Sequence, residues 1–242
     1  MKSILYQLLM VCCLAANAQQ KPDSLNTARN CSYMTPKERD MVYEINCLRS
    51  NPASYLQYIE PMMASAQKKL NEEGKGGKNY SLTTTTYNDG RKNVDTTWHF
   101  INEEEVRALS TLVDDLKRIK PLSVLLPDAG IYKAAAKHAA DQHEHNWTLG
   151  HTGTDGSAPW DRITKYSGKM SFGNENIAGN SMIVTARDIV LQLLVDEGIP
   201  GYGHRYNLLD PQWTHVACKG ERYQGHMDWW VQDFGIIKRK VP

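Results

Sequence analysis

Hydrophobic residues recur at helical spacing along much of the chain, beginning near Thr35. Thr35 can cap a helix, the proline after it suits the first helical position, and Glu38 can complete a capping box. Apolar residues at intervals of three and four follow as far as Leu48. Because the residue before a proline is pushed out of the α region, Pro52 predicts that this helix stops at about Ser50.

The same spacing predicts four further helices. One begins at Asn51-Pro52, and another opens at Asn102, where acidic residues suit the helix dipole, and ends at Pro121. An alanine-rich helix is predicted over residues 128–146, and His138 on its packing face is interpreted as a core histidine. The clearest amphipathic helix has its apolar positions at Ala186, Ile189, Val190, Leu193 and Leu194.

Strand-like alternation stands out near the C-terminus. Residues 213–218 and 227–234 read as paired strands, and glycines between 220 and 225 indicate the turn that joins them. Helices first and strands last, without βαβ alternation, indicate an α+β fold in which helices cover a mainly antiparallel sheet.

Two polar segments carry less pattern. Residues 19–34 are interpreted as an exposed lead-in. Residues 71–100 are rich in glycine, lysine and threonine and bury little surface, so they are interpreted as a flexible insertion, either a mobile loop or a weak hairpin turning at Asp89-Gly90. Residues 35–242 would then form a single domain, since a chain of 242 residues falls in the range of one domain with additions.

Residues 1–18 have the composition of an export signal. Lys2 precedes an apolar run from Ile4 to Ala16, and the small residues at 16 and 18 fit a cleavage site. The run is shorter than the roughly twenty apolar residues that a membrane span needs. We therefore expect an exported protein, secreted or periplasmic, that has no membrane span after cleavage near Ala18-Gln19.

Charge and cysteine content narrow the range of partners. The formal net charge of +1 falls to about 0 once the leader and its Lys2 are removed, which argues against nucleic acid as a partner. Three cysteines remain, Cys31, Cys47 and Cys218, and their spacing does not determine which of them would pair. The hydrophobic core, and not a disulfide framework, must therefore stabilise the fold.

Candidate chemistry gathers between residues 150 and 205. His151 and His204 each sit beside glycine, and Glu175 and the adjacent acids Asp196 and Glu197 lie between them. Imidazoles and carboxylates bind divalent metals, transfer protons and fix one another's tautomers. A fold that joined these side chains would therefore create a site.

The order of these motifs resembles the CAP superfamily, which groups cysteine-rich secretory proteins, antigen 5 and plant pathogenesis-related proteins with many bacterial relatives. The similarity covers roughly residues 36–237 apart from the insertion, and it is most specific over 150–210. It is carried by Gly150-His151-Thr152-Gly153, Asp155-Gly156, Asp161-Arg162-Ile163, Gly173-Asn174-Glu175-Asn176-Ile177-Ala178, Leu193-Leu194-Val195-Asp196 and Gly203-His204-Arg205 with Asn207-Leu208-Leu209.

The resemblance implies a three-layer α-β-α sandwich whose cleft contains two histidines and two acids. In many members this tetrad holds a divalent cation, often zinc. His151, Glu175 and His204 match three of the family's positions. The fourth acid usually follows a tryptophan by three residues; here leucine replaces the tryptophan, Asp196 occupies the acid's place, and Glu197 is the alternative acid.

Several functions are compatible with such a tetrad. Two imidazoles, a carboxylate and a water would give zinc an open coordination position, or the acids would orient the imidazoles from outside the metal shell. We expect a binding module for a lipid, glycan or peptide in the cleft, with zinc or another divalent cation held but not obligatory. Two hypotheses stay open: a secreted metal-dependent hydrolase with Glu175 as base, and a purely structural polar network. The chain has no Gly-x-Ser-x-Gly nucleophile elbow.

Overall fold

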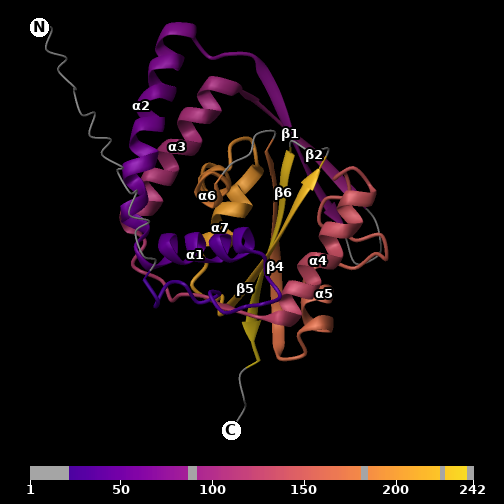
Figure 1. Ribbon diagram of the computed structural model, residues 1–242. Coiled ribbons are helices and arrows are strands. Elements are labelled where there is room, and N and C mark those ends of the chain that lie inside the picture. The colour runs from indigo at the N-terminus through magenta and orange to yellow at the C-terminus, as the bar shows by residue number, and fades with distance from the viewer. Residues whose placement is uncertain (1–21, 87–91, 181–184, 224–226, 239–242) are drawn as a thin grey trace, which may run out of the picture.

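The computed structural model describes residues 22–86, 92–180, 185–223 and 227–238. The leader predicted over residues 1–18 and the turn predicted at Asp89-Gly90 lie outside these residues. In the described part, helices cover both faces of a four-stranded sheet (Figure 1). This arrangement confirms the predicted α+β sandwich.

The first helices follow the sequence pattern closely. Helix α1 (Pro36–Ser50) begins with the predicted capping box, in which the Glu38 carboxylate accepts a 2.7 Å hydrogen bond from the backbone N–H of Thr35. A 3₁₀ turn, η1 (Pro52–Tyr55), then leads into α2 (Leu56–Glu73). As predicted, this second helical segment begins with a proline at its first position.

The remaining helices divide between the two faces of the sheet. Helix α3 packs on α2, while α1, α6 and α7 lie against one face and α4 and α5 against the other (Figure 1). The alanine-rich helix and the amphipathic helix of the sequence pattern correspond to α4 and α6. The bounds of the helices that follow α2 are α3 (Ile101–Arg118), α4 (Ala129–Glu144), α5 (Pro159–Tyr166), α6 (Ala186–Val195), η2 (Pro200–Tyr202) and α7 (Gly203–Leu209).

The sheet has the strand order β3-β5-β6-β4. The predicted C-terminal pair is confirmed as antiparallel β5 and β6, and β4 adds antiparallel to β6, whereas β3 pairs parallel with β5. The strand bounds are β3 (Leu126–Pro127), β4 (Met170–Asn180), β5 (His215–Tyr223) and β6 (Met227–Ile237).

Strand β4 was not predicted, although it carries the Gly173-Asn174-Glu175-Asn176 motif of the family resemblance. Glycine and asparagine are depleted in strands, so local propensity conceals it. Gly173 has a tertiary reason, because a Cβ at this position would lie 2.5 Å from the Phe234 carbonyl oxygen of the neighbouring strand. Close packing against β6 therefore explains the glycine.

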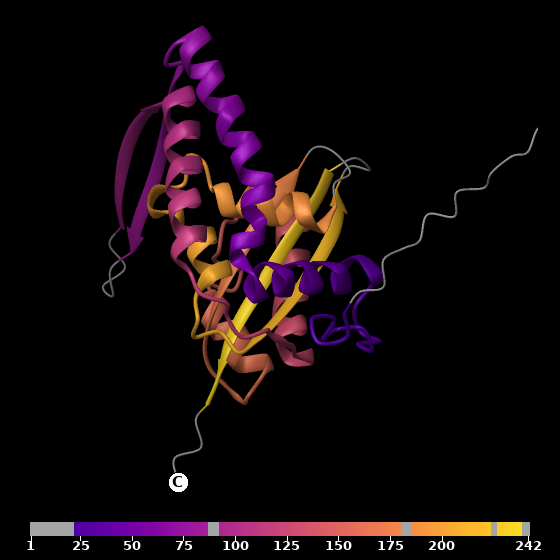
Figure 2. The same ribbon diagram turned by 90° about the vertical axis from the view of Figure 1, so that its left-hand side faces the viewer.

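The insertion after α2 forms an antiparallel hairpin of β1 (Lys78–Thr86) and β2 (Lys92–Phe100). Of the two interpretations of residues 71–100, the hairpin is confirmed over these strands. Figure 2 shows the hairpin beside α3, on the part of the molecule where α2 and α3 extend beyond the sheet. Ser81 of β1 donates a hydrogen bond to the carbonyl of Gly198, which attaches the hairpin to the loop before α7.

The lead-in is more buried than predicted. Within residues 22–34, Ala28 and Met34 belong to the hydrophobic core. The Asn46 side chain of α1 donates to the carbonyl of Leu25 at 3.1 Å. Two apolar residues of the lead-in therefore pack against the core and its backbone finds a partner in α1, while most of residues 22–34 remain exposed.

The core explains how the fold is stabilised. The main cluster joins α1, α3 and α6 to β5 and β6 and also takes in Ile131 and Ala134 of α4 and Ile163 of α5. A smaller cluster, which includes Ala135 and Ala139, lies under α4. Among the described residues, Cys31, Cys47 and Cys218 form no disulfide. Across the described residues, none of the helices combines the length and the apolar character that a bilayer crossing requires.

Candidate functional site

The four tetrad residues come from four segments that meet at the β4 edge of the sheet. His151 follows α4 in a turn, and Glu175 lies on β4. Asp196 forms the C-cap of α6, and His204 is in the first turn of α7. The structure brings these residues together as two histidine–carboxylate pairs.

In the first pair, Asp196 holds His204. Its carboxylate accepts from His204 Nδ1 at 2.7 Å and from the backbone N–H groups of His204 and Arg205 at 2.9 and 3.4 Å. Asp196 has a left-handed backbone (φ 54°), which ends α6 and turns the short side chain toward α7. The shorter aspartate thus reaches the imidazole, and Glu197 does not take this place.

In the second pair, Glu175 holds His151. The Glu175 carboxylate accepts from His151 Nδ1 at 3.0 Å and from Arg162 Nη2 at 2.9 Å. The Glu175 side chain is fully buried, whereas the His151 side chain is 49% exposed. One imidazole is therefore open to solvent while its acid is enclosed and charge-paired.

Polar side chains link the two pairs. Asn207 of α7 donates to the backbone carbonyl of Glu175 at 3.2 Å and to the side chain of Asn176 at 2.8 Å. Asn176 in turn donates to the backbone carbonyl of His204 at 3.2 Å. These bonds tie β4 to α7, so the asparagines around Glu175 position the second histidine.

The imidazole ring centroids of His151 and His204 lie 6.4 Å apart. An ionised carboxylate only accepts hydrogen bonds, so each ring carries its proton on Nδ1. No described protein group hydrogen-bonds to the Nε2 atom of either ring. The site thus presents two imidazole nitrogens to a ligand. Among the described residues, no three histidine, cysteine, aspartate or glutamate side chains converge to hold a single ion.

Behind Glu175 lies a second layer of buried ionisable groups. His138 is fully buried, which confirms the predicted core histidine; its Nε2 donates to the carbonyl of Gly150 at 2.8 Å, and burial lowers its pKa. Asp233 faces Glu175 across β4 and β6. Burial raises the pKa of Asp233 well above its usual range and the charge of Glu175 raises it further, while Arg162 opposes the shift. Asp233 therefore holds its proton more strongly than an exposed aspartate does.

The raised pKa of Asp233 predicts that the stability of the protein depends on pH. Folded Asp233 keeps its proton where the unfolded chain has lost it, so its contribution is fully present below the unfolded pKa, near 4, and is lost as the pH rises toward the folded pKa. Asp233→Asn should therefore stabilise the protein increasingly above pH 4, by about 1.4 kcal/mol per unit of upward pKa shift. Urea unfolding from pH 4 to 8 measures this, and a stability difference that does not change with pH would contradict it.

Sequence reasoning assigned no role to the two arginines that hold the site. Arg162 and Arg205 are both fully buried. Arg205 follows His204 and anchors α7 to α3 and α6, while the Tyr202 ring lies 4.1 Å from its guanidinium carbon. Arg162 and Arg205 both lie within the motifs that carry the family resemblance, and this position was the only sign of their role in the sequence. Arg205 donates to Thr111 Oγ1 at 3.0 Å, to Asp115 at 3.1 Å and to the carbonyls of Ala108, Leu194 and Val195 at 2.8, 2.8 and 3.0 Å.

A groove lined by both polar and apolar side chains continues from His204. Its volume is about 460 Å³, within the range of small-molecule sites. Asp196, Glu197 and Glu105 supply carboxylates at its wall, and burial followed by the charges of Glu105 and Glu104 raises the pKa of Glu197. The apolar lining comes from Met62, Leu109, Ile177, Ala178, Leu193, Val195 and Ile199.

Comparison with known proteins identifies the family to which the chain belongs. No curated protein matches it. An outer surface protein from Borrelia burgdorferi is 23% identical, with a TM-score of 0.40, over 56% of this chain and 95% of that one. An extracellular protein containing an SCP domain from Bacillus anthracis is 18% identical, with a TM-score of 0.37, over 59% of this chain and 46% of that one. Residues 86–234 match the family described as CAP, the cysteine-rich secretory protein family, and the chain belongs to it.

Proposed function

We propose that this CAP protein is exported and acts as a binding module whose two histidines hold a divalent cation such as zinc. The observation that carries the proposal is the pairing of each imidazole with its own buried carboxylate through Nδ1. Carboxylates placed in this way fix the ring tautomer and raise the basicity of the other nitrogen. His151 and His204 would then be the metal ligands, and Glu175 and Asp196 would support them.

The donor set suits zinc. Zinc bonds imidazole nitrogen at about 2.1 Å, so it lies roughly 3 Å from the centroid of the ring that binds it. Rings with centroids 6.4 Å apart therefore need to approach by only about 1 Å to share one tetrahedral ion. A bound zinc would supply a Lewis-acidic position open to a ligand from the cleft.

The geometry favours binding over the alternative of hydrolysis. A general base must reach a proton on the reacting group, and it needs a free oxygen to do so. Both oxygens of Glu175 already accept hydrogen bonds, from His151 and from Arg162, and its side chain is buried. The hydrolase hypothesis with Glu175 as base therefore finds no support here.

The groove beside His204 supports a ligand with an apolar part. A lipid chain or an apolar peptide side chain would bury against its lining and exclude water. The acid Glu197 at the same groove disfavours an anionic ligand, so the polar part of the ligand is expected to be neutral or cationic. Among the three expected ligand classes, lipid and peptide therefore suit the cleft better than a glycan does. In this proposal residues 35–242 act as one domain.

Zinc titration tests the proposal. Calorimetry on the chelator-treated chain should give one ion per chain, and His204→Ala should lower the affinity at least about 100-fold, because one of two protein ligands is lost. Asp196→Asn should lower it about 10- to 100-fold, since the supporting hydrogen bond weakens. His145→Ala serves as the matched control, because that ring bonds the Asp141 carbonyl outside the cleft.

The same titration separates the structural hypothesis from the binding one. His151 is half exposed, so His151→Ala should abolish tight zinc binding and change the free energy of unfolding by less than about 1 kcal/mol. Zinc uptake by His204→Ala equal to that of the wild type would refute the site. A large loss of stability in His151→Ala without any zinc effect would identify a purely structural network.

A further inference from the structure

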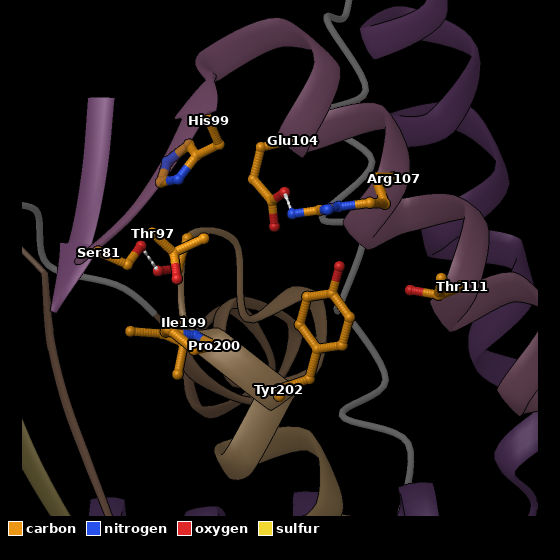
Figure 3. Close-up of a pocket in the computed structure, with 11 residues that line it drawn as sticks. Ser81, Thr97, His99, Glu104, Arg107, Thr111, Ile199, Pro200 and Tyr202 are labelled. Carbon is orange, nitrogen blue, oxygen red and sulfur yellow. Dashed lines mark hydrogen bonds and ion pairs between the residues drawn. The ribbon is translucent and has the colours of Figure 1, made fainter. Parts of the chain in front are cut away.

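A second cavity lies against the loop that joins Asp196 to His204. Its volume is about 370 Å³, and it is an open cavity bordered by the β1–β2 hairpin, the first turns of α3 and the loop over residues 198–202 (Figure 3). Neither histidine of the metal site lines it. The cavity therefore exists because the inserted hairpin covers this side of the domain.

The hairpin turns one polar face toward this cavity. Ser81 pairs with Thr97 and Asn79 with His99 in the β1–β2 register, so these side chains share one side of the ribbon. Figure 3 shows Ser81, Thr97 and His99 at the cavity wall. The opposite side carries the exposed aromatic pair Tyr80 and Trp98. The hairpin thus places hydroxyl and imidazole groups over α3.

The wall opposite the hairpin carries an ion pair between two residues of α3. Arg107 donates to the carboxylate of Glu104, and this glutamate side chain is only 3% exposed, whereas that of Arg107 is 61% exposed. Neighbouring acids are neutralised too, Glu103 by Lys75 at 2.8 Å and Glu105 by Lys69 at 3.4 Å. The cavity wall thus combines several hydrogen-bonding groups of little net charge with the apolar surface of Ile199, Pro200 and Tyr202.

Several of these groups have hydrogen-bond donors or acceptors that no described protein group uses. Within the described part of the chain, neither the His99 ring nor the Thr97 hydroxyl has a hydrogen-bond partner, and both line the cavity. Arg107 has donors beyond those used on Glu104. Tyr202 presents an aromatic ring at the same wall, and its hydroxyl points toward Arg107 (Figure 3). A ligand would thus meet donors, acceptors and one aromatic surface.

The polar lining extends past Arg107. A smaller cavity of about 250 Å³ shares His99, Glu104 and Arg107 with the first and is lined also by Trp98 and Phe100. The three polar residues are therefore shared between two neighbouring cavities. An elongated ligand could place one unit on each side of them.

We propose that this cavity binds a neutral saccharide. Sugar hydroxyls both donate and accept, which suits a paired carboxylate and guanidinium, an imidazole and a threonine hydroxyl set around one space. The apolar face of a sugar ring suits the Tyr202 ring. Short oligosaccharides would extend past Arg107 toward Trp98.

Other ligand classes fit less well. An anion would meet the buried carboxylate of Glu104 beside Arg107, and a cation would meet the exposed guanidinium. An apolar ligand would bury His99 and Thr97 without hydrogen-bond partners, which costs free energy. A neutral ligand rich in hydroxyl groups avoids all three penalties.

Binding of the labelled full-length mature chain to an array of neutral glucose, galactose, mannose and N-acetylglucosamine oligosaccharides tests the inference. At least one class should bind. His99→Ala should weaken that binding about tenfold, and Thr97→Val about threefold, as expected for lost hydrogen bonds. Thr96→Val is the matched control, because Thr96 lies on the outer side of the same strand and should leave binding unchanged.

The outcomes distinguish this cavity from the metal site. His204→Ala should bind the same saccharide as the wild type does. Absence of binding to every neutral saccharide would overturn the inference, as would wild-type affinity in both His99→Ala and Thr97→Val. Saccharide binding lost only in His204→Ala would place the sugar in the metal cleft, and displacement by phosphate or acetate would identify an anion site; either result would also overturn it.

Discussion

Arg205→Met is expected to lower the free energy of unfolding by about 3–5 kcal/mol, because it removes a buried charge whose partners stay behind. The Arg205 guanidinium is fully buried and bridges α7 to α3 and α6. Without it, Asp115 loses its buried partner and several backbone carbonyls lose a donor. For a chain of this size the melting temperature should fall on the order of 10 °C.

Arg118→Met provides a matched control for this prediction. Arg118 donates to the same Asp115 at 3.2 Å, but its side chain is 75% exposed. An exposed ion pair contributes at most about 1 kcal/mol, so this variant should unfold almost as the wild type does. Similar losses in both variants would show that burial of Arg205 does not determine its effect.

Glu175→Gln should also lower the free energy of unfolding by about 3 kcal/mol or more. The substitution leaves the buried Arg162 without a compensating charge, and breaking a buried pair from one side is strongly destabilising. It also weakens the acceptor that holds His151, so zinc affinity should fall about 10- to 100-fold. Urea unfolding and zinc calorimetry measure the two effects on the same preparation.

A double substitution separates charge from packing. Glu175→Gln combined with Arg162→Met removes both members of the pair and should regain much of the stability lost in the single variant. Glu103→Gln, which removes an exposed partner of Lys75, should change stability by less than about 1 kcal/mol. A double variant less stable than either single one would contradict the assignment of a coupled buried pair.

The sequence determined the elements whose signals are local. Thr35 and Glu38 cap the N-terminus of the first helix through hydrogen bonds between residues three apart. The apolar residues from Ala186 to Leu194 define the buried face of α6. Both helices were therefore predicted almost residue by residue. The motif order also identified the family and nominated the tetrad histidines and acids.

Tertiary structure alone decided how the site is built. The partner of each histidine depends on backbone geometry, as the left-handed Asp196 shows, whereas residue order placed Asp196 at the acid's position but left Glu197 as an alternative. β4 exists because β6 pairs with it, despite the low strand propensity of its glycines and asparagines. Likewise, Arg205 gains its role only from carbonyls that folding brings to it from distant segments. Contacts between remote segments leave no periodic trace in a sequence, whereas caps and amphipathic faces do.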